Sequence, residues 1–68
     1  MQNEALVAVD AALRSLPLRQ QQVFLLRAWE EMSVAEAAEV MGVSQGTVKT
    51  HYSRAVRALR QILEEHRI

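Results

Sequence analysis

The sequence contains no cysteine, one proline, two glycines and three aromatic residues among its 68 positions. Without cysteine the chain can form neither a disulfide nor a thiolate metal site, so a domain this short has to be stabilised by packed helices or by a partner. The scarcity of aromatic side chains suits a small helical core better than a sheet. The longest apolar run, Ala5 to Val9, is far shorter than the about 20 residues that cross a bilayer, and it lacks the basic flank of a signal peptide. We therefore expect one soluble, cytoplasmic domain over residues 1–68 that does not associate with a membrane.

Acidic residues are missing from the stretch Gly42 to Arg60, although eight acidic and eight basic residues cancel over the whole chain. The same stretch holds Lys49, Arg54, Arg57 and Arg60. A neutral protein that gathers positive charge on one segment is expected to direct that segment at something negative.

The few helix-breaking residues divide the chain into helices. The first is expected from about Glu4 to Ser15, and the second from Pro17, which suits a first helical turn, to about Trp29. Ser33 opens a third, short helix, because its hydroxyl can accept from the N–H of Glu36 while the Glu36 carboxylate reaches back. We predict an all-α fold of four helices, three short and one longer.

The junction between the third and fourth helices indicates a function. Gly42 can take the left-handed conformation that ends the third helix, and Ser44 can cap the fourth only two residues later. A short helix, a tight turn with glycine and a longer basic helix are typical of a helix-turn-helix motif, whose second helix enters the DNA major groove. We place this motif at about residues 33–60.

The helical wheel of the fourth helix separates an apolar side from a basic one. The predicted core side holds Val48, Tyr52, Ala55, Leu59, Ile62 and Leu63. The opposite side holds Lys49, Thr50, Ser53, Arg54, Arg57 and Gln61. Arginine can bind guanine through two hydrogen bonds, hydroxyls can contact bases or phosphates, and lysine neutralises phosphate, so this face has the chemistry to bind DNA.

Simpler interpretations exist for the same residues. A charged helix face is commonly only a solvated face, although such faces normally mix both signs of charge. Tyr52 and Trp29 are expected to fill the core, and His51 lies at its edge or contacts a phosphate. No carboxylate pair, nucleophile or set of metal ligands occurs at a workable spacing, so we expect no enzyme, no catalytic residue, no metal site and no cofactor.

The stretch from Leu16 to Leu63 resembles a known family. The resemblance rests on the leucine-proline start at Leu16, the FLLR segment at 24–27, Ser33, the GTVK segment at 46–49 and the RALR segment at 57–60. These motifs resemble the C-terminal promoter-recognition domain, region 4, of sigma-70 family RNA polymerase sigma factors of the extracytoplasmic-function type. The resemblance implies binding to the minus-35 promoter element and direction of RNA polymerase to initiate transcription.

The resemblance and the basic face together define an expected DNA-binding set: Arg27, Ser33, Ser44, Gly46, Thr47, Lys49, Thr50, Ser53, Arg54 and Arg57. Arg54 is the best candidate for a base contact. Lys49, Thr47 and the start of the fourth helix are expected to hold phosphates, helped by the positive end of the helix dipole. Arg27 and Ser33 match family positions that touch the DNA backbone beside the groove.

The sequence departs from the family pattern at three positions. His51 replaces a common arginine and removes one positive charge, and Ser53 replaces a frequent histidine or aromatic residue, so the base preference cannot be taken over. Glu31 stands where many members have glycine, which leaves the turn there undefined.

Two other functions fit parts of the sequence. Output domains of the LuxR type have a similar layout and a TVK-x-H pattern, here at Thr47 to His51, and bind paired half-sites as dimers. Alternatively, the domain binds protein: members of the resembled family pack on the flap of the polymerase beta subunit in the core enzyme and are often captured by an anti-sigma factor. The first helix favours such a partner, because it is apolar nearly all round from Ala5 to Leu13.

Overall fold

A computed structural model describes residues 4–65 of the chain. Its elements are α1 (Glu4–Arg14), α2 (Leu18–Phe24), the π-helical turn η1 (Leu25–Trp29), α3 (Val34–Met41) and α4 (Gln45–Glu65). Because η1 continues α2 directly, the described part consists of three short helical segments and one long helix, and it contains no strand. The predicted all-α fold is confirmed. None of the helices within residues 4–65 is long and apolar enough to cross a membrane.

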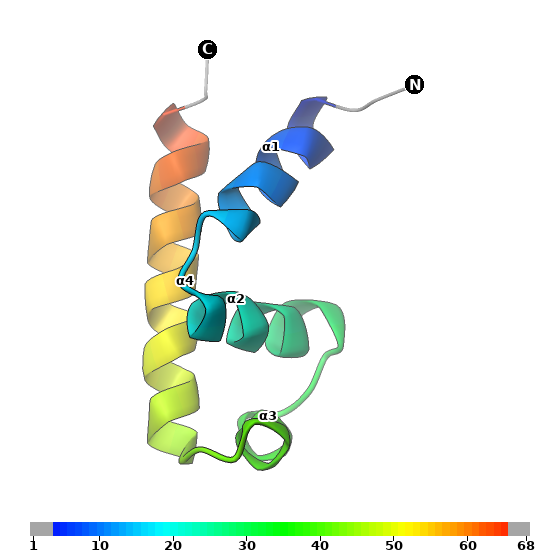
Figure 1. Cartoon of the computed structure of the whole chain (residues 1–68), viewed down its shortest axis with the longest axis vertical. Coiled ribbons are helices and arrows are strands. Elements are labelled where there is room, and N and C mark those ends of the chain that lie inside the picture. Colours follow the sequence, from blue (N-terminus) through cyan, green and yellow to red (C-terminus); the bar gives the residue numbers. More distant parts are fainter. Residues whose placement is uncertain (1–3, 66–68) are drawn as a thin grey trace.

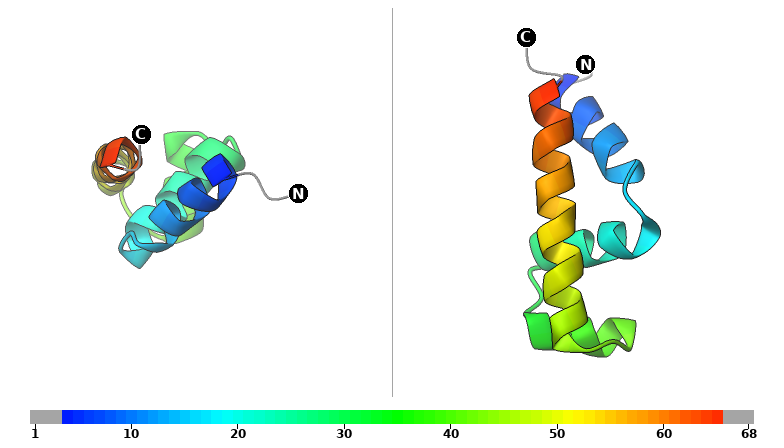
Figure 2. Two further views of the ribbon diagram at one scale, coloured as in Figure 1. Left: turned by 90° about the horizontal axis from the view of Figure 1, so that it is seen from above. Right: turned by 90° about the vertical axis from the view of Figure 1, so that its left-hand side faces the viewer.

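The 21-residue helix α4 forms the long axis of the molecule (Figure 1). The other helices lie on one side of it: α1 beside its C-terminal half, α2 across its middle and α3 beside its N-terminal end (Figure 2). Helices α1, α2 and α3 all contact α4. The side of α4 that faces away from them is therefore free to face a partner.

The core consists of two separate clusters along α4. In the first, Ala12 and Leu16 pack against Ala55 and Leu59, with Phe24 and other half-buried residues around them. This cluster attaches α1 to the C-terminal half of α4. The small side chains of Ala12 and Ala55 allow the helices to approach closely, and they also keep the cluster thin.

The second cluster holds the helix-turn-helix together. Val23 of α2, Ala37 and Ala38 of α3, and Val48 of α4 are its buried residues. Val23 and Val48 are completely inaccessible to solvent. Because Val48 is in the first turn of α4, this cluster fixes the N-terminal end of the basic helix relative to α3.

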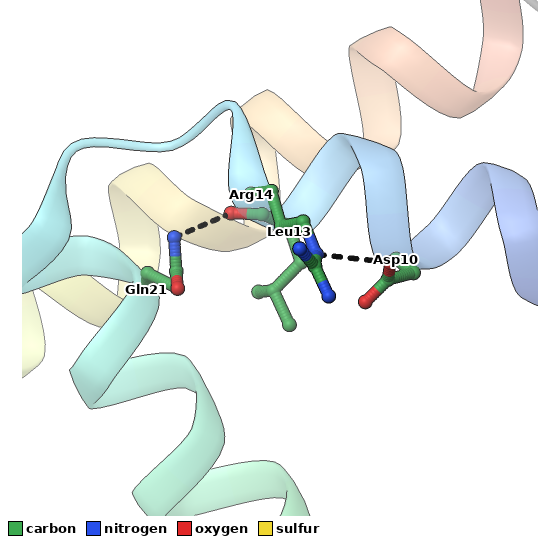
Figure 3. A network of polar contacts seen from close by, with 4 residues as sticks. All are labelled: Asp10, Leu13, Arg14 and Gln21. Carbon is green, nitrogen blue, oxygen red and sulfur yellow. Dashed lines mark hydrogen bonds and ion pairs between the residues drawn. The ribbon is translucent and has the colours of Figure 1, made fainter.

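The connection between α1 and α2 is made by backbone and side-chain hydrogen bonds. The sequence predicted Pro17 in the first turn of the second helix. The structure places it at the N-cap of α2, one residue earlier. The Nε2 of Gln21 donates to the carbonyl oxygen of Leu13 at 3.1 Å and so ties α2 back to α1 (Figure 3). Nearby, Arg14 pairs with Asp10 at 3.0 Å, but both side chains are exposed, so this ion pair adds little stability.

The second helix ends in a wide turn that the sequence did not predict. In η1 the N–H of Glu30 donates to the carbonyl of Leu25, five residues back, which is the π-helical pattern. Glu31 then takes a left-handed conformation with φ 56°, and the N–H of Met32 donates to the carbonyl of Leu26 at 2.9 Å. Glu31 thus has a backbone conformation that favours glycine.

The prediction that Trp29 fills the core is wrong. Its side chain is 80% exposed, because it is the last residue of η1 and the chain turns away immediately after it. Trp29 instead borders an apolar depression between α1 and η1 that Val9 and Leu13 also line. On α1, Val7 and Val9 are exposed as well, which agrees with the expected apolar outer surface. The side chains of Ala5 and Leu6 lie outside the described part.

Candidate nucleic-acid interface

The turn between α3 and α4 has the two caps that the sequence predicted. Gly42 takes a left-handed conformation with φ 67°, and the N–H of Val43 donates to the carbonyl of Ala38, so α3 ends in a Schellman motif. Ser44 then accepts from the N–H of Thr47 at 3.1 Å, and the two hydroxyls lie 2.9 Å apart. These bonds place the start of α4 only a few residues from the end of α3.

The N-terminus of α4 is open to solvent. Ser44, Gln45 and Gly46 are exposed, and Thr47 is half-buried. The first N–H groups of a helix have no acceptor within the helix, and the helix dipole makes this end positive. The cap on Thr47 satisfies one of these donors, and those of Gln45 and Gly46 remain at the surface, where an anion such as a phosphate can be bound.

The basic side of α4 is exposed as the helical wheel predicted. A shallow depression on this side is lined by Lys49, Thr50, Ser53, Arg54 and Arg57. All five side chains are exposed, whereas Val48, Ala55 and Leu59 on the opposite side are buried. The structure therefore brings together half of the ten predicted DNA-binding residues on one surface.

No carboxylate among the side chains that the structure describes, those of residues 7–65, neutralises this surface. The ion pair in this part of the chain joins Asp10 and Arg14 of α1. Along α4, acidic residues occur only in the last turn, at Glu64 and Glu65. The charge of Lys49, Arg54 and Arg57 is therefore available to an external anion.

Arg27 lies beside this surface and is held by internal contacts. Its guanidinium carbon lies 5.3 Å from the centroid of the Tyr52 ring, and its Nη1 donates to the carbonyl of Met32. Tyr52 in turn stacks on Phe24 with ring centroids 6.0 Å apart. Tyr52 is half-buried and packed against the second core cluster, as predicted, and His51 is half-buried at the edge. Arg27 thus connects the π-helical turn, the loop before α3 and the middle of α4.

Ser33 caps α3 through the predicted capping box. Its Oγ accepts from the N–H of Glu36 at 3.0 Å, and the Glu36 carboxylate accepts from the N–H of Ser33 at 2.9 Å. The hydrogen bond from the Ser33 backbone N–H is the main cause that holds the pKa of Glu36 below its usual 4.5. The hydrogen bond with the Ser33 side chain lowers this pKa further.

The expected DNA-binding set left out Arg60, a cation of this region that belongs to the basic stretch of the sequence. Arg60 lines a second depression together with Arg27, Lys49 and Arg57. The signal was present, because Lys49, Ser53, Arg57 and Arg60 follow one another at intervals of three or four residues on a helix. Within residues 4–65 there is no cluster of histidine and acidic residues that could hold a metal ion.

Comparison with known proteins assigns the family. The family described as "Sigma-70, region 4" matches residues 6–59. An RNA polymerase sigma-E factor of Streptomyces antibioticus is 45% identical over 53 residues, which is 78% of this chain and 29% of the relative. The ECF RNA polymerase sigma factor BldN of Streptomyces coelicolor is 44% identical over 54 residues, or 79% of this chain and 20% of the relative. The chain thus spans less than a third of the length of either relative.

A solved structure agrees with this assignment. BldN in its complex with RsbN matches with a TM-score of 0.80 and 41% identity, covering 85% of this chain and 42% of that one. An identity this high over most of the chain supports a shared fold and shared ancestry. The chain therefore belongs to the sigma-70 region 4 family, among the sigma factors of the extracytoplasmic-function type.

Proposed function

We propose that this domain binds the minus-35 element of promoter DNA through α4, as the promoter-reading part of a sigma factor that directs RNA polymerase to initiate transcription in the cytoplasm. The observation that carries the proposal is the exposed, carboxylate-free surface of α4, held against α3 by a tight turn. Membership of the sigma-70 region 4 family favours this reading over an output domain of the LuxR type.

The residues of the proposed interface have different roles, some contacting bases and others contacting phosphates. With α4 in the major groove, Arg54 and Thr50 point at base edges, and Arg54 can bind guanine through two hydrogen bonds. Lys49 and the N-terminal turn with Ser44, Gly46 and Thr47 bind phosphates of the adjacent backbone. Ser53 and Arg57 extend the contact toward the middle of the helix, and Arg27 and Ser33 meet the backbone beside the groove.

The isolated domain is expected to bind DNA weakly. Each phosphate contact contributes a salt slope of about −0.9, and a chain with zero net charge gains little long-range attraction. In a complete sigma factor, attachment to the RNA polymerase core raises the effective concentration of this domain at the promoter.

The DNA-binding proposal is tested by selecting ligands for the chain from a pool of random duplexes. The account predicts a short asymmetric consensus, since one domain contacts one site. A two-fold symmetric consensus with paired half-sites points instead to a dimer of the LuxR kind. No enrichment over the starting pool rules out sequence-specific binding by this chain.

A second function, binding of a protein partner, is favoured by the apolar surface next to α1. Val7 is 51% exposed and Trp29 80%, and the depression between α1 and η1 is mainly apolar. Surface of this kind fits a helix of the polymerase beta flap or of an anti-sigma factor. The relative BldN forms a complex with the protein RsbN, which supports a partner of this class.

The protein-partner proposal is tested by recording NMR shifts of the labelled domain on addition of a purified flap fragment. Shifts at Val9, Leu25 and Trp29 are expected, with none on the basic side of α4. The absence of shifts in α1 and η1 would show that the flap does not bind to this surface.

A further inference from the structure

A second depression adjoins the basic side of α4, where η1 and the start of α3 pack against that helix. Four cations line it, namely Arg27, Lys49, Arg57 and Arg60, and none of its lining residues is a carboxylate. A cationic groove without a counter-charge attracts an anionic ligand, and the low-dielectric walls on either side strengthen that attraction. We call this depression the phosphate groove.

The phosphate groove is continuous with the surface proposed to read DNA. Lys49, Ser53 and Arg57 line both the groove and the depression on the basic side of α4. An anionic polymer lying on one surface therefore extends directly into the other. This continuity favours the DNA backbone over a separate small anion as the occupant.

Arg27 supplies a fixed cation on the η1 side of the groove. The Met32 carbonyl and the Tyr52 ring hold its guanidinium in place, so little side-chain entropy is lost when an anion binds. A guanidinium has five N–H donors, and the contact with the Met32 carbonyl uses a donor of Nη1 only. Donors of Arg27 therefore remain for an external ligand.

The cations on the α4 side form a line along the helix. On a helical wheel, Lys49, Arg57 and Arg60 fall within an arc of about 80°, turned away from the direction of Arg54. From Lys49 to Arg60 the helix rises by about 16 Å. Phosphates of one strand follow one another every ~3.4 Å of duplex axis, so a line of this length can contact several of them, whereas a small anion would occupy only one end.

We propose that the phosphate groove binds the backbone of one DNA strand beside the bases read by Arg54, and that Arg60 is a further DNA-contacting residue. The inference rests on the proposed promoter-binding function and extends its interface along α4 from Arg57 to Arg60, by about one helical turn. Val34, in the first turn of α3, also lines the groove, so the strand passes the end of α3 near Ser33. In this arrangement the groove fixes the register of α4 in the major groove without reading sequence.

The test compares Arg60→Gln with Arg19→Gln in duplex binding measured by fluorescence anisotropy. Both residues are exposed, and both substitutions remove one positive charge, but Arg19 lies on α2 beside a different, mainly apolar depression. Each variant binds a duplex recovered by selection and a scrambled duplex over a range of salt concentrations. Circular dichroism confirms that both variants are folded.

The proposal predicts that Arg60→Gln weakens binding to both duplexes by the same factor. Loss of one phosphate contact reduces the salt slope by about 0.9 and lowers affinity about fivefold near 0.15 M salt. Arg19→Gln should leave both quantities unchanged. If wild-type protein binds the selected duplex specifically and Arg60→Gln binds as tightly as Arg19→Gln, the phosphate groove is overturned while promoter binding stands. If wild-type protein binds no duplex, the proposed function itself fails.

A second arm locates the contacted strand. Methylphosphonates, which lack the phosphate charge, replace phosphates one at a time on either strand flanking the selected site. At the phosphate that Arg60 contacts, neutralisation should weaken wild-type binding and leave the Arg60→Gln variant with no further loss. At phosphates held by the other cations of the groove, both proteins should lose affinity. Equal losses for both proteins at every position contradict a contact between Arg60 and the backbone.

Discussion

Arg54 and Lys49 are one and a half turns apart on α4, both exposed, and they are assigned different roles. Arg54→Ala is expected to cost about 1–3 kcal/mol of specific binding and to relax preference at one or two base pairs. Lys49→Ala should weaken binding to all sequences alike and flatten the salt slope by about 1. Salt titrations with selected and scrambled duplexes separate the two effects, and unchanged DNA binding in both variants would refute the assignment of α4 as the reading helix.

Glu31 is the non-glycine residue with a left-handed backbone among the described residues, at φ 56°. A side chain in this conformation is strained, so Glu31→Gly should stabilise the fold by about 0.5–1 kcal/mol after the greater freedom of glycine in the unfolded chain is deducted. Urea denaturation measures the change. Glu31→Gln keeps the strain and removes only the charge, so an equal gain in that variant would show that charge, not backbone conformation, is the cause.

Individual exposures were the least predictable property of the sequence. Trp29 was expected inside and lies outside, because a π-helical turn changes the register of the residues that follow and has no signature in the local sequence. Arg27 was expected only at the DNA backbone, and the structure also places it over the Tyr52 ring, a contact between residues 25 positions apart in the sequence. Such contacts depend on how helices pack, which periodicity alone does not specify.

At the scale of the element, the capping box of α3 makes the stability of the fold depend on pH. The pKa of Glu36 is lowered in the folded state from 4.5, so its carboxylate stabilises the fold fully above about pH 4.5. This contribution is lost as pH falls below 4.5 through the folded-state pKa.

Glu36→Gln tests this dependence, because glutamine can still accept a hydrogen bond and does not titrate. Wild-type protein should be the more stable at neutral pH, and the difference in unfolding midpoint should shrink as pH falls below about 4.5. Urea unfolding at a series of pH values measures it. A difference that is as large in acid as at neutral pH contradicts the role given to the ionised carboxylate.

A substitution at Gly46, in the first turn of α4, is expected to affect DNA binding without destabilising the fold. A Cβ at this position would lie 3.8 Å from the Ser44 Oγ, an ordinary contact, so the fold does not require glycine here. Gly46→Ala should leave stability unchanged or raise it by up to about 1 kcal/mol. DNA affinity should nevertheless fall, since the added methyl group stands where the backbone of DNA approaches. A variant that gains stability and binds DNA as tightly as wild-type protein shows that Gly46 is not at the interface.

Helix boundaries were predicted well where they depend on residues close in sequence. The capping box at Ser33, the left-handed Gly42 and the cap at Ser44 all involve bonds over three to five residues, and all three are present. The end of the second helix at Trp29 was also predicted, but its π-helical form was not, because the wide turn at Glu31 contains no glycine, proline or side-chain cap that would indicate it.

At the scale of the whole molecule, a thin core in two clusters supports the interface. A domain of 68 residues is expected to have a stability of only about 3–10 kcal/mol. Val48 belongs to the cluster that holds α3 against α4, and its side chain is fully buried. Stability and DNA binding are therefore coupled through one small group of residues.

Val48→Ala should destabilise the fold by about 2 kcal/mol, from lost burial and the cavity left behind. Val40→Ala is the matched control, since Val40 is 62% exposed on α3 and the same two methyl groups are removed. Thermal or urea unfolding of the two variants measures the difference. If both variants lose the same stability, the second cluster is not the structural core of the helix-turn-helix.

The overall arrangement could be derived from the sequence only in part. The apolar and basic sides of α4 were predicted from periodicity, and Val48, Ala55 and Leu59 are buried as expected. The sequence did not predict that the basic surface continues into a groove bordered by Arg27 of η1. This prediction would have required knowledge of how α2 crosses α4.

The most direct test of the central claim is fluorescence anisotropy of the wild-type chain and Arg54→Ala with a selected asymmetric duplex at low and moderate salt. The account predicts salt-sensitive binding that favours the selected duplex over a scrambled one, and a loss of this preference in Arg54→Ala. If wild-type protein binds neither duplex even at low salt, the basic side of α4 is a solvated surface. The claim that α4 reads promoter DNA is then wrong.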